Sequence, residues 1–305
     1  MGGRAFAALA AASMAAAALT ACGGERQDTT GLTTSAGTTT SAGTTTSTGT
    51  STAATTTGSS QTTTEEFSPE PAKLEPPGRR CGIFGSRARA LWFRAADGTR
   101  LEGATTGTGT VGVVFVHEYP GPPNGAYCGF LPFATELAHH GIRSLLFNLR
   151  CFGESECPDE KARSDIDDVR GAVRKVERLG ARHVVIVGAS LGGIVALRSA
   201  AAIRPPVAGV VSLSGELNLG PLLGPDDLDS AKAAPRVVSP ALLAVGEGDQ
   251  YVSVAEMKTI YRRLGTDRKR LAVADAGHGW ELLHVPGGTS TIGRQVTDFI
   301  LAAGR

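Results

Sequence analysis

The serine at position 190 lies between two glycines in Gly188-Ala189-Ser190-Leu191-Gly192, which fits a Gly-x-Ser-x-Gly pattern. The pentapeptide alone is a weak signal, because a glycine-rich turn can also bind phosphate or simply reverse the chain. Here it directly follows an apolar run at 183–187 that predicts a strand, and it directly precedes a predicted helix at 191–202. A nucleophilic serine in such a turn needs small residues two positions before and after it, and the helix dipole favours negative charge at its Oγ. We therefore predict that Ser190 is a nucleophile.

Candidate acid and base residues follow two later predicted strands. Asp249 comes after the strand expected at 241–245, and His278 comes after the strand expected at 270–274. When the nucleophile occupies a strand-to-helix turn, the acid and then the histidine are expected after later strands, at the same edge of the sheet. We predict that His278 accepts the Ser190 proton, and that Asp249 orients the imidazole and stabilises its cation.

Two alternatives accompany this assignment. Glu247 is a rival acid in the same loop as Asp249, and His278 is read alternatively as a surface histidine. The glycines on both sides of His278 favour the catalytic interpretation, because they let a loop bring a side chain inward. No spacing of His, Cys and Asp residues suggests a metal site, and no cofactor is expected.

A possible oxyanion hole follows the strand predicted at 111–116. The chain continues there as His117-Glu118-Tyr119-Pro120-Gly121. A tetrahedral intermediate needs two preorganised N–H donors, each of which contributes about 3 kcal/mol to the stabilisation of the transition state. We predict that the backbone N–H groups of Tyr119 and Leu191 supply them.

The elements that must position these residues alternate along the chain. A hairpin around the turn Ala96-Asp97-Gly98 precedes a regular series of strands and helices. Strands are expected at 88–94, 100–105, 111–117, 142–148, 183–187, 207–213, 241–245 and 270–274, and helices at 131–140, 164–179, 191–202, 254–264 and 292–301. This order predicts an α/β fold with a doubly wound, mostly parallel sheet that is covered by helices on both faces.

The motif set, spread over residues 88–301, resembles the α/β-hydrolase superfamily. It comprises the His-x-x-Pro-Gly loop, the Gly-x-Ser-x-Gly turn, the post-strand aspartate and the Gly-His pair. Residues 147–155 also resemble the family's Asp-x-Arg-Gly-x-Gly-x-Ser turn, with Asn148 in place of Asp and Cys151 in place of Gly. Large lid domains of this superfamily are commonly inserted where this chain has only residues 214–240, so no large lid domain is expected.

Within that superfamily, His117-Glu118 resembles dienelactone-hydrolase-like members. In those enzymes a glutamate at this position can contact the resting nucleophile, which is often a cysteine. Because this chain has Ser190 instead, the resemblance does not by itself give that role to Glu118.

The N-terminus has the features of an export signal. One basic residue, Arg4, precedes an apolar run at 5–21, and Leu19-Thr20-Ala21-Cys22-Gly23 resembles the lipobox of bacterial lipoproteins. The resemblance implies that Cys22 carries a diacylglycerol thioether and becomes the first residue of the mature protein. An ordinary signal peptide with a chance cysteine is the alternative. A single transmembrane anchor is disfavoured, because the run is short and rich in alanine.

The segment that follows predicts a spacer. Residues 28–66 are a Thr/Ser/Gly/Ala tract with a six-residue repeat, and they offer almost nothing that folding could bury. The predicted organisation is therefore a signal peptide at 1–21, a disordered tether at 22–77 and a hydrolase domain at 78–305.

Four cysteines remain after Cys22, namely Cys81, Cys128, Cys151 and Cys157. An even number in an exported protein suggests two disulfides, for which three pairings are possible. The pairing Cys151–Cys157 with Cys81–Cys128 is favoured, because the first closes a short loop and leaves the second.

Composition narrows the function. The chain has 305 residues and a net charge of +1. Because nucleic-acid-binding proteins carry an excess of basic residues, this charge gives no indication of nucleic-acid binding. We expect a lipid-anchored extracytoplasmic serine hydrolase, a carboxylesterase that cleaves a small or medium ester. An acyltransferase or peptidase with the same triad is the alternative enzyme, and a binding lipoprotein on a hydrolase scaffold is the non-catalytic alternative.

Overall fold

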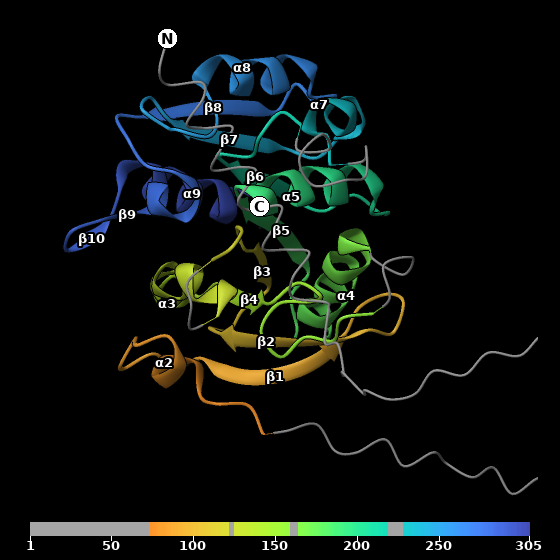
Figure 1. Ribbon diagram of the computed structural model, residues 1–305, viewed down its shortest axis with the longest axis vertical. Helices are drawn as coiled ribbons and strands as arrows, with labels where there is room; N and C mark the ends of the chain where they lie inside the picture. The colour runs from red at the N-terminus through yellow and green to blue at the C-terminus, as the bar shows by residue number, and fades with distance from the viewer. Residues whose placement is uncertain (1–72, 122–124, 159–163, 219–227) are drawn as a thin grey trace, which may run out of the picture. The chain divides into compact units, whose positions relative to one another are not determined.

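The computed structural model describes residues 73–121, 125–158, 164–218 and 228–305, and an eight-stranded sheet forms its centre (Figure 1). The strands are β1 (Arg89–Arg94), β2 (Arg100–Thr106), β3 (Val111–Val116), β4 (Arg143–Phe147), β5 (His183–Ala189), β6 (Gly209–Leu213), β7 (Ala241–Gly246) and β8 (Lys269–Ala274). Their order is β1-β2-β4-β3-β5-β6-β7-β8. The hairpin β1–β2 joins β4 in antiparallel fashion, and the six strands from β4 to β8 run parallel. The predicted doubly wound, mostly parallel sheet is confirmed.

Helices cover both faces of this sheet (Figure 1). The longer ones are α3 (Leu131–His139), α4 (Asp165–Arg178), α5 (Leu191–Ala202), α8 (Val254–Arg263) and α9 (Thr291–Ala302), and the short ones are α2 (Pro77–Arg80) and α7 (Ser230–Ala233). Helices α4, α5 and α8 share one apolar layer with the sheet, whereas α3 and α9 share the other.

Strand β3 illustrates why these runs form buried parallel strands. Val113 and Phe115 point into the layer of α3 and α9, whereas Val114 and Val116 point into the layer of α4 and α5. All four side chains are inaccessible to solvent. A strand with both faces covered needs apolar residues at every position, which is the pattern of the sequence.

Short elements outside the periodic pattern complete the fold. The 3₁₀ helices are η1 (Ala126–Phe130), η3 (Ala234–Arg236) and η4 (Gly279–Leu283), and a small hairpin is formed by β9 (His284–Val285) and β10 (Gly288–Thr289). Between β6 and β7, the described part of the connection holds only α7 and η3. In the part of the chain that the structure describes, no helix has both the length and the apolar character that crossing a membrane requires.

Two disulfides tie loops to this framework. Cys81, at the end of α2, is bonded to Cys128 in η1, and Cys151 is bonded to Cys157 in the turn after β4. This is the pairing that the sequence favoured. The predicted signal peptide, Cys22 and nearly all of the predicted tether lie outside the described residues, and α2 begins one residue before the expected domain boundary at 78.

Candidate active site

Ser190 occupies a strained turn between β5 and α5. Its φ is 49°, a left-handed value that residues other than glycine rarely adopt. The flanking glycines make this turn possible. A Cβ at Gly188 would lie 1.9 Å from the Gly192 carbonyl oxygen, and one at Gly192 would lie 2.1 Å from the Val116 carbonyl oxygen. The turn therefore requires glycine at both positions and holds the Ser190 side chain at the carboxyl edge of the sheet.

His278 and Asp249 form a pair at the same edge, after β8 and β7. His278 Nδ1 lies 2.9 Å from Asp249 Oδ2 and 3.0 Å from Oδ1. Asp249 Oδ1 also accepts the backbone N–H groups of Tyr251 and Val252, at 2.9 and 3.2 Å. Glu247, the rival acid, is exposed at the surface. The arrangement is that of an oriented imidazole whose Nε2 is available to a substrate or a nucleophile.

The electrostatics of this pair favour its charged form. Burial alone would raise the pKa of Asp249, but the hydrogen bonds from His278 and the backbone outweigh it, and the net pKa is lowered. Burial alone would lower the pKa of His278, but the Asp249 carboxylate outweighs it, and the net pKa is raised. Asp249 thus stays ionised and stabilises an imidazolium at position 278.

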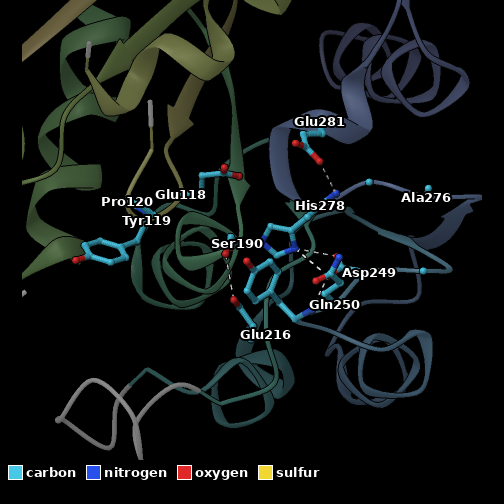
Figure 2. Close-up of a pocket in the computed structure, with 13 residues that line it drawn as sticks. Glu118, Tyr119, Pro120, Ser190, Glu216, Asp249, Gln250, Ala276, His278 and Glu281 are labelled. Atoms are coloured by element: carbon cyan, nitrogen blue, oxygen red, sulfur yellow. Dashed lines mark hydrogen bonds and ion pairs between the residues drawn. The ribbon is translucent and has the colours of Figure 1, made fainter. Parts of the chain in front are cut away.

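Ser190, His278 and Asp249 line one cavity of about 440 Å³ (Figure 2). The other described residues that line it are Glu118, Tyr119, Pro120, Glu216, Gly248, Gln250, Tyr251, Ala276, Gly277 and Glu281. Figure 2 shows Tyr119 and His278 on opposite sides of Ser190. The expected nucleophile, base and acid, together with one expected oxyanion residue, are thus brought together, and Leu191 begins α5 directly after Ser190.

The partner of Ser190 is a residue that the sequence analysis missed. Ser190 Oγ donates a hydrogen bond to Glu216 Oε1 at 3.0 Å, and within the described residues it makes none to His278. Glu216 follows β6, so it obeys the same rule that identified Asp249, a carboxylate just after a parallel strand. Burial raises the pKa of Glu216, because water no longer solvates its charge.

The loop after β3 is fixed by a buried histidine. His117 Nδ1 donates to the Glu118 carbonyl oxygen at 2.7 Å, while His117 Nε2 accepts the Leu149 N–H at 3.0 Å. These contacts require the neutral imidazole, and burial lowers the pKa of His117 to about 4. His117 therefore holds Glu118 and Tyr119 in place and is a structural residue.

Glu118 does not contact Ser190 by a hydrogen bond among the described residues. Its Oε2 accepts the backbone N–H of Trp280 at 3.4 Å instead. Burial raises the pKa of Glu118 to about 7, since few donors replace the lost water.

The turn after β4 packs against the loop that carries His117 and Tyr119. Asn148 Nδ2 donates a hydrogen bond to the buried carboxylate of Glu102 at 2.7 Å. Glu102 also forms an ion pair with Arg80. A carboxylate therefore lies next to Asn148, the residue that replaces the family's aspartate. Cys151 adopts a φ of 67°, which glycine would adopt more easily. Further along this turn, Phe152 packs its ring edge-on against Tyr119, with centroids 5.8 Å apart.

No metal centre accompanies these residues within the described ranges. Among them, no group of three or more His, Cys, Asp or Glu side chains is arranged to hold a metal ion.

An eight-stranded sheet in this order, with a strained serine turn between β5 and α5, is the fold of an α/β hydrolase. Residues 113–280 match the family model described as "Alpha/beta hydrolase family", and the chain belongs to that family. No curated protein matches the chain significantly by sequence.

Solved structures give the same fold. An esterase from Pyrococcus furiosus is similar with a TM-score of 0.64 at 18% identity, over 78% of this chain and 97% of that one. A thermophilic esterase from Thermogutta terrifontis has a TM-score of 0.56 at 20% identity, over 71% and 100%. A meta-cleavage product hydrolase from Pseudomonas fluorescens has a TM-score of 0.57 at 18% identity, over 70% and 98%.

Proposed function

We propose that this protein is a serine hydrolase that cleaves carboxylic esters through an acyl-enzyme on Ser190. The observation that carries the proposal is the geometry of one cavity, in which a strained serine lies beside a half-buried histidine that is paired with an aspartate. Family membership and the esterases among the structural neighbours support the reaction class.

The reaction follows from the positions of the groups. Ser190 Oγ turns from Glu216 towards His278, whose Nε2 takes its proton as Oγ attacks the ester carbonyl carbon. The imidazolium, stabilised by Asp249, then returns the proton to the departing alcohol. Water repeats the two steps on the acyl-enzyme, releases the carboxylic acid and restores Ser190.

The oxyanion of each tetrahedral intermediate needs donors on the side of Ser190 away from His278. In this proposal they are the backbone N–H groups of Tyr119 and Leu191. The second belongs to the first residue of α5, so the helix dipole adds to its effect.

Location and subtype are further parts of the proposal. The lipobox-like Leu19–Cys22 segment supports a lipid anchor on Cys22, and the two disulfides are compatible with an oxidising, extracytoplasmic compartment. His117-Glu118 supports a dienelactone-hydrolase-like relationship within the family. However, the carboxylate next to Ser190 comes from Glu216, which differs from the pattern of that subgroup.

A panel of esters with acyl chains of increasing length tests the proposal, run beside Ser190→Ala. We expect turnover by the wild type, loss of turnover in the variant, and labelling of Ser190 alone by a fluorophosphonate probe. Labelling elsewhere, or equal turnover by the variant, would favour the non-catalytic binding lipoprotein. Acyl transfer to an added alcohol, or cleavage of amides, would favour the acyltransferase or the peptidase.

A further inference from the structure

The cavity around Ser190 has an acidic wall. Four carboxylates line it, those of Glu118, Glu216, Asp249 and Glu281, and none of the described lining residues is a lysine or an arginine. Asp249 is paired with His278. Glu281 accepts the backbone N–H of His278 at 3.3 Å. Glu281 is also exposed to solvent, so Glu118 and Glu216 are the more enclosed carboxylates of this wall that no histidine pairs with by a hydrogen bond.

Glu216 is incompletely satisfied even in the resting site. Its Oε1 accepts the Ser190 hydroxyl, whereas its Oε2 is enclosed and has no hydrogen-bond partner among the described residues. Catalysis removes the first contact as well, because Ser190 must donate to His278. A buried carboxylate with no donor is unfavourable, and a positively charged donor from the substrate would replace the one that is lost.

The position of that donor follows from distances. Ser190 Oγ is 3.0 Å from Glu216 Oε1. A reacting carbonyl carbon lies about 3 Å from the nucleophile, and an ammonium nitrogen lies about 2.8 Å from a carboxylate oxygen. In an α-amino acid the nitrogen and the carbonyl carbon are about 2.5 Å apart. The 3.0 Å contact belongs to the resting site, so once the Ser190 hydroxyl turns to His278, an ammonium on the carbon next to the carbonyl can take its place against Glu216 Oε1.

We propose that the preferred substrates are α-aminoacyl esters, and that Glu216 is the residue that selects their ammonium group. This inference rests on the proposed ester hydrolysis and adds its substrate class. Glu118 contributes to the negative field of the same cavity, which disfavours acyl groups that carry a carboxylate. The reaction is ester plus water to α-amino acid plus alcohol, and it needs no other reactant.

The test uses the full-length protein and compares its activity on three benzyl esters. These are the benzyl ester of L-alanine, the benzyl ester of propionic acid and the monobenzyl ester of succinic acid. Release of benzyl alcohol gives kcat/KM, which is normalised by the rate of each ester with hydroxide. We expect the alanine ester to be favoured over the propionic ester by about tenfold or more, because a charge-assisted hydrogen bond is the stronger one. The succinic monoester should be the poorest of the three.

Glu216→Gln keeps the shape and an acceptor for Ser190 but removes the charge. It should reduce the alanine-to-propionic ratio to near one. The matched control is Glu247→Gln, the same change at the same sheet edge but at an exposed residue outside the cavity lining, and it should leave the ratio unchanged. A wild-type ratio near one, or a high ratio that survives in Glu216→Gln, overturns the inference and leaves the serine hydrolase standing.

Binding to Ser190→Ala separates this inference from the proposed function. L-alaninamide and propionamide are titrated into that variant and followed by NMR shifts of the His278 ring. Tighter binding of alaninamide supports cation selection even if no ester in the panel is cleaved, a result that would remove the hydrolase proposal alone. Equal binding overturns cation selection.

Discussion

Carboxylates in this one cavity differ in pKa because their burial and their hydrogen-bond donors differ. Asp249 receives the imidazole and two backbone N–H groups, which hold its pKa below the ordinary value. Glu118 has one long backbone contact, and burial raises its pKa to about 7. Glu216 has one hydroxyl donor, and burial raises its pKa as well. Asp249, the residue best supplied with donors, is the one that stays ionised without a substrate, whereas Glu216 would gain a charged donor only from the proposed ammonium group.

The effects on kcat of removing the Ser190 and His278 side chains should not be additive. Either Ser190→Ala or His278→Ala should reduce kcat on the order of 10⁴–10⁶-fold, and the double variant should be hardly worse than either single one. The reason is that a base without a nucleophile to activate contributes little. Steady-state kinetics of the three variants measures this, and a double variant slower by the product of the two losses would contradict a concerted role.

The pH dependence of hydrolysis should depend on the negative charges that surround His278 in the cavity. Only neutral imidazole accepts a proton, so kcat/KM for a neutral ester should rise with pH through the pKa of His278, which lies above its ordinary value. The negative charges of Glu216 and Glu118 help to raise that pKa. Glu118→Gln should therefore shift the acidic limb to lower pH, because one of these charges is gone. An unchanged or upward shift, relative to Glu247→Gln, would contradict this electrostatic coupling.

At the scale of the elements, the sequence predicted the strands and the strand-to-helix turn at Ser190 because both depend on local patterns. Continuous β-branched runs mark buried strands, and α5 was predicted with its observed bounds, Leu191–Ala202. Glu216 was missed because candidate residues were sought after the strands β3, β7 and β8 but not after β6, which Glu216 follows. The contact of Glu102 with Asn148 was not predictable, because it joins residues 46 positions apart through antiparallel pairing of β2 and β4.

The turn that carries Ser190 should tolerate no side chain at its glycines. In Gly192→Ala the new Cβ would meet the backbone carbonyl of Val116, which cannot move without disturbing β3. We expect a loss of about 1–3 kcal/mol or more in the free energy of unfolding, as for other overpacked cores. Thermal unfolding measures it, beside Gly288→Ala, where a Cβ meets nothing within 4 Å. Equal stability of the two variants would show that the turn is less constrained than its contacts indicate.

At the scale of the whole molecule, the disulfides brace the periphery of the sheet rather than its core. Cys81–Cys128 spans 47 positions and joins α2 to η1, next to the Arg80–Glu102 ion pair. Cys151–Cys157 spans only 6 positions within the turn after β4. A longer closed loop restricts the unfolded chain more, so the two bonds should differ in their effect on stability.

Removing the long-range bond should therefore cost more. In the chain-entropy model the double variant Cys81→Ser/Cys128→Ser has a free energy of unfolding lower by about 4 kcal/mol than the wild type. For Cys151→Ser/Cys157→Ser the decrease is about 2 kcal/mol. Denaturant unfolding of the two variants gives the comparison. Alkylation of the native wild type should find no free thiol among these four cysteines. A reactive Cys128 or Cys151 would contradict the bonded state.

The proposed location of the protein in the cell depends on Cys22, a residue far from the site in sequence. If Cys22 carries a lipid, Cys22→Ala should release the protein from the membrane fraction, because an unlipidated chain loses the acyl chains that partition into the bilayer. Fractionation of cells that express either form, with a high-salt wash, measures this. The wash removes proteins held only by charge, so it separates a lipid anchor from surface adsorption. The released protein should keep its esterase activity and both disulfides, since the described residues that line the cavity and all four bonded cysteines lie far beyond Cys22 in the chain. Cys22→Ala protein that still sediments after the wash would contradict the lipid anchor and favour the N-terminal apolar segment as the anchor.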